Sequence, residues 1–301
     1  MSQLDASASA VTGFGDLLPR RSQRSLLRRF ARHRLAAVGL GILLIFGFLA
    51  TFAPIVSVYD PNFTNLDALR ESPSLSHPLG TDAAGRDVWA RMLSAGRVSL
   101  AVGLLAAAIS MVIGTVLGIV SGYVGGWVDN LIQRFTEIVM MFPTLFALIL
   151  LVAVVGSSVI NVIVIIGALG WTGKTRLVRG QVLSLKEMEY VTAARAIGAG
   201  GTHLMVKHLL PGVIPYVVVA TMLTISGAIL SEATLSFLGL GVRIPTATWG
   251  NMINSAQSLN VLKNEPWLWL PPGIAISTTV LAVNFVGDGL RDALDPHSLL
   301  D

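Results

Sequence analysis

Residues 98-VSLAVGLLAAAISMVIGTVLGIV-120 contain no charged side chain. A helix of about 20 apolar residues crosses the roughly 30 Å hydrocarbon core of a bilayer, so this stretch predicts a membrane-spanning helix. Five more apolar stretches of this kind lie at 35–56, 131–155, 159–171, 213–230 and 269–286. The stretch at 159–171 is short, and we expect its helix to continue towards Val178. The sequence therefore predicts an all-α integral membrane protein with six transmembrane helices.

Composition supports this fold class. The chain has 301 residues, of which 53% are hydrophobic and 13% are charged. Soluble domains carry about 25% charged residues, so too few are present to coat an ordinary soluble enzyme. Intrinsic disorder requires low hydrophobicity and is excluded as well. The chain has no cysteine, which excludes disulfides, thiolate metal sites and cysteine nucleophiles.

The positions of the basic residues predict the orientation. Seven arginines precede or open the first apolar stretch: Arg20, Arg21, Arg24, Arg28, Arg29, Arg32 and Arg34. By the positive-inside rule they place the N-terminus in the cytoplasm. A secretory signal peptide is the alternative, but its apolar region is only 7–15 residues long, so we interpret 35–56 as a retained anchor.

Alternating the six helices across the membrane divides the chain into regions. The predicted regions are a cytoplasmic basic segment at 1–34, a six-helix membrane domain at 35–290 and a cytoplasmic tail at 291–301. Within the membrane domain, 57–97 and 231–268 are external loops and 172–212 is a long cytoplasmic loop. This assignment places fifteen basic residues inside and six outside, with both termini in the cytoplasm.

The long internal loop contains 187-EMEYVTAARAIGAGGTHLMVKHLLPGVIPY-216. On a helix, Tyr190, Ala194 and Ile197 form one stripe, and Gly198 followed by Gly200 ends that helix. Thr202 is expected to cap a second short helix that reaches Leu210, and Pro211 to break it before the next span. The pattern predicts a helix of small residues with little of its own chain to cover it. Such a surface is suited to docking into the groove of a partner.

This segment resembles the EAA loop of bacterial ABC-importer permeases. The matching positions are Ala193, Ala194, Gly198, Leu210 and Pro211. Thr192 and His208 depart from the general pattern, where Glu and Ile are usual. The dipeptide/oligopeptide branch has a looser form, which this chain matches at Glu189, Tyr190, Val191, Ala193, Ala194, Arg195, Ala196, Gly198 and Ala199. Further blocks resemble the same branch: 77-HPLGTDAAGRDV-88, 96–100, 122-GYVGGWVDN-130, 238-LGLG-241, Trp249-Gly250 and 287-GDGLRDALDP-296.

The resemblance implies a type I ABC importer permease fold in a bacterial inner membrane, as the non-catalytic subunit of a peptide importer. Implied partners are a second homologous permease, two cytosolic ATPase subunits or domains and an extracytoplasmic substrate-binding protein. ATP and Mg²⁺ would bind those ATPases, and this chain would hold no cofactor. The implied ATPase-coupling residues are Glu189, Tyr190, Ala193, Ala194, Arg195, Gly198, Leu210 and Pro211. Nickel or glutathione stays open as the solute.

The sequence also contains polar residues within the spans, a glycine ridge and an amphipathic segment in the first external loop. Polar residues within the predicted spans are candidates for lining a pathway: Asn161, Thr221, Thr224, Ser226 and Asn284. Ser and Thr also bond to their own helix backbone. Gly114, Gly118 and Gly122 form a ridge that permits close helix packing, within the chain or with a second permease. An amphipathic helix is expected near 87–94 in the first external loop, capped by Thr81 or Asp82.

Three features bear on alternative functions. The segment at 167–175 approaches a phosphate-binding loop, but Ala168 replaces a required glycine, so we interpret Lys174 as part of the basic inner end of the fourth span. Glu137, Glu232 and Asp288 lie near predicted membrane boundaries, where carboxylates are solvated or paired; an ion-coupled secondary transporter would require carboxylates at the midplane. The five histidines form no metal-ligand pattern, and no nucleophile–base arrangement indicates catalysis.

Overall fold

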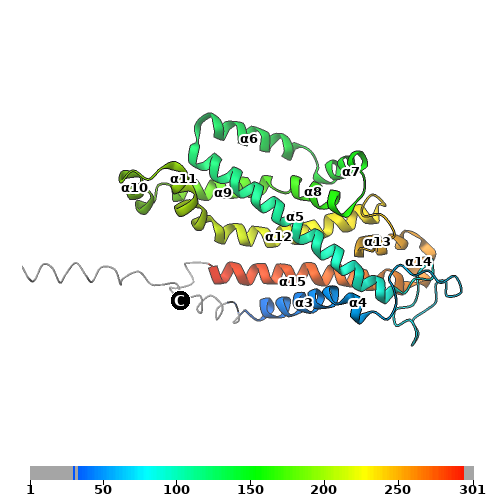
Figure 1. The fold of residues 1–301 in the computed structure, drawn as a ribbon. Helices are drawn as coiled ribbons and strands as arrows, with labels where there is room; N and C mark the ends of the chain where they lie inside the picture. Colours follow the sequence, from blue (N-terminus) through cyan, green and yellow to red (C-terminus); the bar gives the residue numbers. More distant parts are fainter. Residues whose placement is uncertain (1–29, 31–32, 295–301) are drawn as a thin grey trace, which may run out of the picture.

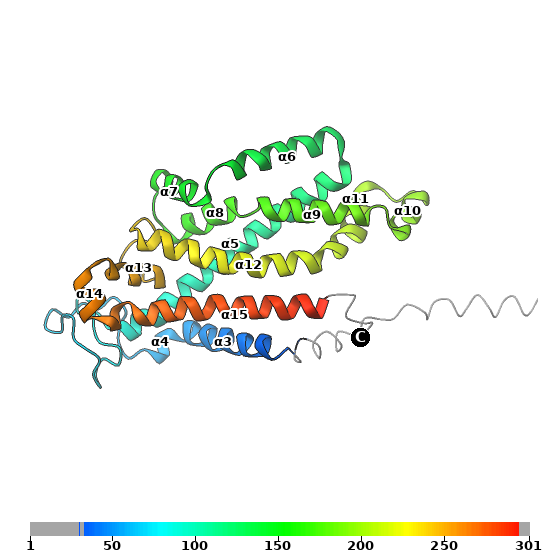
Figure 2. The ribbon, with the colours of Figure 1, turned by 180° about the vertical axis from the view of Figure 1, so that it is seen from behind.

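The computed structural model describes residue 30 and residues 33–294. Predictions for the arginines before residue 30, for Arg32 and for the tail beyond residue 294 lie outside this part. Four long helices form the body of the molecule: α3 (Arg34–Thr51), α5 (Val88–Val124), α12 (Leu210–Phe237) and α15 (Leu270–Leu294). They run along the length of the molecule, and α5 crosses α12 and α15 obliquely (Figures 1 and 2). The all-α prediction is confirmed.

Four segments are long and apolar enough to cross a membrane. They are Arg34–Thr51, Val88–Val124, Gly201–Phe237 and Pro266–Leu294. Each contains or overlaps one of the predicted spans at 35–56, 98–120, 213–230 and 269–286. A fifth candidate is a bent pair of helices at the position of the third predicted span. The described residues therefore give four candidate spans, or five with the bent pair.

The third predicted span is not one straight helix. It consists of α6 (Gly126–Met141) and α7 (Thr144–Val155), which are bent by 87°. Phe142, between them, has extended backbone angles. A residue before proline is driven out of the helical region, so Pro143 explains the break. The predicted single helix over 131–155 is therefore wrong.

The fourth predicted span is also divided. It comprises α8 (Val159–Leu169) and α9 (Thr172–Leu185). The side chain of Ser158 caps α8 by accepting from Asn161 N at 3.1 Å. At the joint, Ser110 Oγ donates to Gly170 O at 2.8 Å, so a side chain from α5 satisfies this carbonyl. The expected continuation beyond residue 171 towards Val178 is confirmed, and the helix extends to Leu185.

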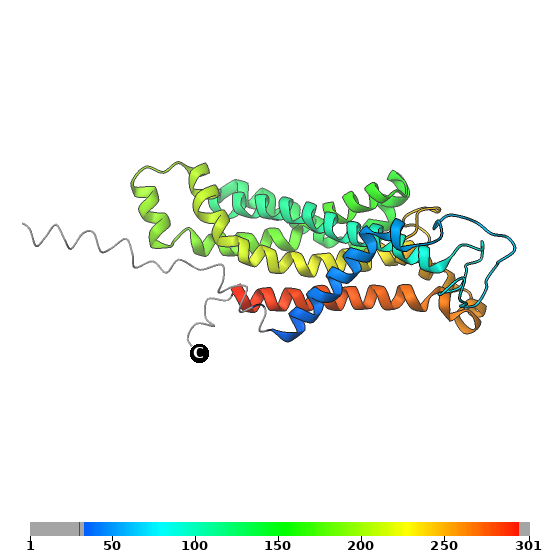
Figure 3. The same ribbon diagram turned by 60° about the horizontal axis from the view of Figure 1, so that its bottom comes forward.

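The loops gather at the two ends of the molecule. Helices α10 (Glu189–Ala196) and α11 (Gly201–Leu204) lie at the same end as the start of α3 and the end of α15 (Figure 3). The segment 57–87 and the short helices α13 (Trp249–Ile253) and α14 (Leu259–Asn264) lie at the opposite end. The described part of the chain also contains shorter elements: α4 (Ala53–Val56), η2 (Met205–Leu209), η3 (Asn254–Gln257) and η4 (Pro266–Leu268).

The glycine ridge on α5 packs against α9 within the same chain. A Cβ at Gly114 would lie 2.6 Å from Lys174 Cβ, and one at Gly118 would lie 2.6 Å from Val178 Cβ. A Cβ at Gly122 would lie 2.8 Å from Val182 Cβ. The contacting residues therefore recur every four positions on both helices. Because glycine has no side chain, the two backbones approach closely, and the intrachain interpretation of the ridge is confirmed.

The helix expected near 87–94 is the N-terminal part of α5 and is continuous with the second predicted span. Asp87, and neither Thr81 nor Asp82, caps it by accepting from Ala90 N at 2.7 Å. Thr81 instead donates to Ala68 O, and Asp82 Oδ1 accepts from the backbone N–H groups of Ala84 and Arg86. These two residues order the loop before α5. Further along α5, Ser99 Oγ accepts from Trp249 N at 3.1 Å, so two of the quoted sequence blocks meet here.

Candidate functional site

Helix α10 is the centre of the predicted coupling segment. Glu189 lies in its first turn and Arg195 in its last. The helix ends in a tight turn, in which Ala199 N donates to Ala194 O at 3.1 Å and Gly198 N donates to Arg195 O at 3.0 Å. Gly198 has a φ of 90°, which side chains strongly disfavour. The prediction that Gly198 ends this helix is confirmed.

One side of α10 is buried against its own chain. Val191 is 0% exposed and Ala194 is 8% exposed. They belong to a core cluster with residues from α5, α9 and α12, among them Val178, Val182, Leu209 and Val213. Tyr190 and Ile197, by contrast, are exposed. The expectation that the helix has little of its own chain to cover it is therefore wrong, and Ala194 lies on the covered side.

Five exposed residues of α10 and its C-terminal end form a surface that we call the loop face: Glu189, Tyr190, Ala193, Arg195 and Ile197. Ile197, directly after the helix, is 88% exposed and Tyr190 is 47% exposed. Neither Glu189 nor Arg195 forms an ion pair with another described residue. The loop face therefore offers apolar side chains and two charges of opposite sign.

The segment after Gly198 differs from the prediction. Gly200, and not Thr202, occupies the N-cap position of α11, where no side-chain cap bond forms. From Gly201 the helix continues through the π-helical turn η2 into α12, so Pro211 does not break it. Leu210 N donates to Met205 O, five residues back, and Pro211 follows in the first turn of α12. Since the hydrogen-bond pattern changes here, the N–H that proline lacks falls at a transition between helix types.

The predicted coupling residues gather at one end of the molecule. The rings of Tyr190 and His208 lie 6.1 Å apart, which brings α10 against η2. Leu210 packs on the same core cluster as Ala194, and Pro211 is exposed. The loop therefore consists of α10 folded back on the start of the long helix that leads into the membrane domain.

A polar network holds α9, which leads into this loop, against α6. Arg179 donates to both carboxylate oxygens of Asp129, at 2.7 and 2.6 Å. Ser121 donates to the same carboxylate at 2.5 Å, and Gln133 donates to Ser121 at 3.0 Å. The block 122–130 thus supplies Asp129 for an ion pair with α9. The sequence does not predict this ion pair, because a contact between residues 50 positions apart leaves no local pattern.

The five candidate pathway residues do not converge on one cavity. Thr221 donates to Val217 O, within its own helix, and Asn161 donates to Gly156 O beside the start of α8. Ser226 donates to Asn284 Oδ1 at 3.0 Å, which joins α12 to α15. Thr224 accepts from Lys174 Nζ at 2.5 Å. The structure brings only Ser226 and Asn284 together, and all five have partners within the chain.

Comparison with known proteins identifies the family. Residues 114–299 match the model of the binding-protein-dependent transport system inner membrane component, and 23–75 match that of the N-terminal transmembrane domain of oligopeptide transport permease C. This chain belongs to the binding-protein-dependent transport permease family. The permease is 43% identical over 273 residues to a putative peptide permease of Brucella suis biovar 1, covering 91% of this chain and 90% of the relative.

Two further relatives extend over nearly the whole permease. The glutathione transport system permease protein GsiD of Salmonella typhimurium is 44% identical over 274 residues, covering 91% of this chain and 90% of the relative. The oligopeptide transport system permease protein OppC of Bacillus subtilis is 39% identical over 293 residues, covering 96% of this chain and 95% of the relative. The resemblance found in the sequence is confirmed, and the chain is a multi-pass membrane permease.

Two buried ionisable residues of the permease depart from expectation. Lys174 is 4% exposed, and its Nζ donates to Ser110 Oγ at 2.6 Å as well as to Thr224. It therefore lies between α5, α9 and α12, and the expected place at a basic boundary is wrong. Glu232 is 1% exposed and accepts from Ser236 at 2.7 Å and from Ser99 at 3.3 Å. It forms no ion pair with another described residue, so the expectation of a solvated or paired carboxylate is wrong for Glu232.

Proposed function

We propose that this permease is one of two membrane subunits of an ATP-driven ABC importer that carries peptides into the bacterial cytoplasm. Two of the relatives above are named as peptide or oligopeptide permeases, which supports a peptide as the solute. In the proposed assembly a second permease completes the translocation pathway. An extracytoplasmic binding protein delivers the peptide, and two ATPase subunits or domains bind ATP and Mg²⁺.

The loop face is the observation that carries this proposal. It lies at the end of the molecule opposite the 57–87 loop, and it exposes the large apolar side chain of Ile197 as well as Glu189 and Arg195. An amphipathic helix with such a face fits a groove on a partner. In the proposal that groove belongs to a cytosolic ATPase, which places α10 and both termini in the cytoplasm. Leu210 and Pro211 then join the docked helix to the membrane domain, with Gly198 permitting the turn between them.

Uptake by the complete assembly tests the proposal. The assembly is reconstituted into liposomes from this permease, the second homologous permease, the ATPases and the binding protein. A labelled tripeptide is added outside the liposomes. We expect accumulation that requires MgATP at the ATPase side and stops with vanadate. Uptake by this chain alone, driven by an ion gradient without ATP, would contradict the importer and support an ion-coupled secondary transporter.

Glutathione is a second candidate solute, because the Salmonella relative named as a glutathione permease is 44% identical. Competition in the same uptake assay separates the solutes. Unlabelled oligopeptides are expected to reduce tripeptide uptake more strongly than glutathione or nickel at equal concentration. Stronger inhibition by glutathione or nickel would change the assignment of the solute and leave the ATP-driven mechanism in place.

A further inference from the structure

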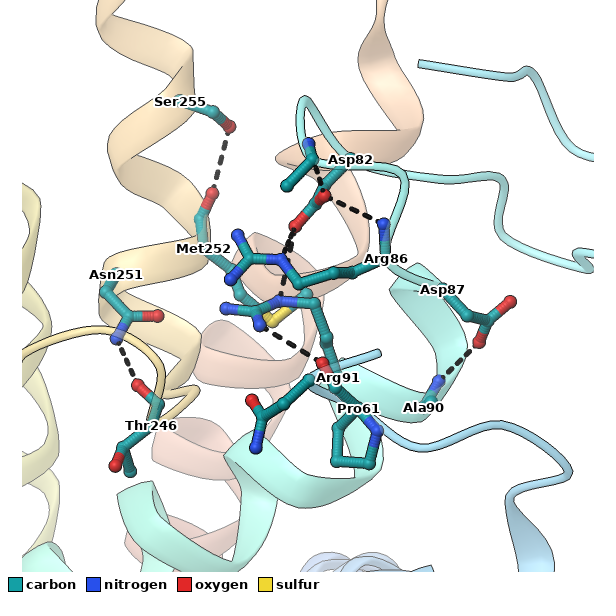
Figure 4. Close-up of polar contacts among 12 residues, drawn as sticks. Pro61, Asp82, Arg86, Asp87, Ala90, Arg91, Thr246, Asn251, Met252 and Ser255 are labelled. Atoms are coloured by element: carbon teal, nitrogen blue, oxygen red, sulfur yellow. Dashed lines mark hydrogen bonds and ion pairs between the residues drawn. The ribbon is translucent and has the colours of Figure 1, made fainter. Parts of the chain in front are cut away.

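A small cavity lies at the end of the molecule remote from the loop face. Its volume is about 190 Å³, and it is partly open at the surface. It is formed where the loop before α5 meets the first turn of α5, α13 and α14. Three arginines, Arg70, Arg86 and Arg91, line it together with Asp82. Figure 4 shows Arg86 and Arg91 beside Asp82. Apolar side chains, including Val88, Met252 and Leu268, complete the lining.

Positive charge exceeds negative charge among these groups. Arg70 is paired with Glu265, which it contacts at 2.7 and 2.9 Å. Arg86 and Arg91 share one carboxylate: Asp82 Oδ2 lies 2.8 Å from Arg86 Nε and 3.5 Å from Arg91 Nε. The other oxygen of Asp82 already accepts from two backbone N–H groups. Two guanidinium groups therefore face a single carboxylate whose oxygens are both occupied.

These guanidinium groups are sheltered from solvent. The side chain of Arg91 is 5% exposed and that of Arg86 is 15% exposed. Figure 4 shows the two groups side by side, directed towards Met252 on α13. A buried charge is costly unless it is paired, so an additional anion at this position would be favoured.

The arginines also retain donors for such an anion. A guanidinium carries five N–H donors in a planar fork that matches a carboxylate. Arg91 Nη1 donates to Pro61 O at 3.2 Å. The terminal nitrogens of Arg86 donate no hydrogen bond to another described residue, since its side chain is bonded only through Nε. Arg86 can therefore receive a carboxylate at its terminal nitrogens.

We infer that this cavity binds the C-terminal carboxylate of a peptide solute. The inference rests on the proposed peptide import, which places the cavity on the extracytoplasmic side. A water molecule occupies roughly 30 Å³ of liquid, so a cavity of about 190 Å³ has room for a carboxylate and a short aliphatic group. Arg86 and Arg91 hold the carboxylate, while Val88, Met252 and Leu268 contact the aliphatic part of the terminal residue. The site is selective for a free C-terminus because an amide brings no negative charge.

Site-specific arginine labelling tests the inference on the unmodified complex. The assembled transporter in lipid nanodiscs is treated with phenylglyoxal, and the rate at each arginine is followed by mass spectrometry. Trialanine at about ten times its Kd is expected to slow labelling of Arg86 about tenfold by mass action. Arg243, which is exposed and outside the cavity, is the control in the same sample and should be unaffected. Trialanine amide should protect neither arginine.

Two comparisons complete the test. Equal protection of Arg86 by acetate and trialanine at the same concentration would contradict a peptide occupant, and equal protection by the amide would contradict carboxylate recognition. In calorimetric titrations, Arg86→Gln should weaken trialanine binding by about tenfold or more, because a charge-assisted pair is lost. Lys263→Gln removes an exposed charge outside the cavity and should leave binding unchanged. If the assembly takes up peptide with ATP but trialanine does not protect Arg86 from labelling, this site alone is overturned. If the assembly takes up no peptide, the proposed function is overturned.

Discussion

Gly118 and Gly180 lie on the two packed helices α5 and α9, but their surroundings differ. A Cβ at Gly118 would lie 2.6 Å from Val178 Cβ and 2.9 Å from Thr175 O, whereas one at Gly180 would meet nothing within 4 Å. Gly118→Ala is therefore expected to lower the free energy of unfolding by about 1–3 kcal/mol, the usual cost of overpacking. Thermal unfolding of the purified protein in detergent measures the change.

Gly180→Ala is the matched control at this scale. Alanine is favoured over glycine inside a helix by roughly 0.5–1 kcal/mol, so this variant should be as stable as the parent or more so. Equal stability of the two variants would mean that α5 and α9 are not in close contact at Gly118.

The two sides of α10 predict different outcomes for neighbouring alanines. Ala193 is exposed and Ala194 is 8% exposed against the core cluster. Ala194→Glu buries a carboxylate without a partner and should lower stability by about 1–3 kcal/mol or more. Ala193→Glu should leave the melting temperature unchanged and reduce co-purification with the ATPases, because the glutamate lies on the loop face. Normal ATPase binding by stable Ala193→Glu would contradict docking through this face.

The contact between helices α6 and α9 can be tested through the coupling free energy of the ion pair that joins them. Arg179 and Asp129 are 32% and 15% exposed and share two hydrogen bonds. A double-mutant cycle with Asp129→Asn and Arg179→Gln should give a coupling free energy of about 1–3 kcal/mol. The exposed pair Arg134–Glu137, within α6, serves as the control and should give about 0.3–0.5 kcal/mol. Equal coupling in the two cycles would show that the Asp129–Arg179 contact does not hold the helices together.

At the scale of the whole molecule, the absence of cysteine makes the orientation directly testable. Lys263 lies in α14 and Ile197 directly follows α10, and both are exposed. Helices α14 and α10 lie at opposite ends of the molecule. In intact cells, a membrane-impermeant maleimide should label Lys263→Cys but label Ile197→Cys only after permeabilisation. Labelling of both variants in intact cells, or of Ile197→Cys alone, would contradict the proposed orientation.

The features of the fold that have a local sequence signal were predicted correctly. Apolar runs predicted the four long helices, and the four-residue repeat of glycine predicted a close helix contact. The breaks in the helices at Pro143 and at Gly170 were not predicted, since an apolar run does not show whether a helix bends within it. The burial of Ala194 and Lys174 was not predicted either, because it depends on residues from α5, α9 and α12 that are distant in the sequence. The loop helix and its terminal glycine were predictable, whereas the side that faces the chain was not.

The continuity of α5 has a mechanical consequence. Its 37 residues form one helix of about 55 Å, with no proline and no interruption. One end packs against α9 and the core cluster that buries Val191 and Ala194. The other end supplies Arg91 to the remote cavity and Ser99 to the contact with Trp249. A rod of this kind acts as a lever: tilting it at one end displaces the other by a comparable distance in the opposite sense. A rigid α5 would therefore carry a movement at α10 to the far surface without rearranging side chains in between.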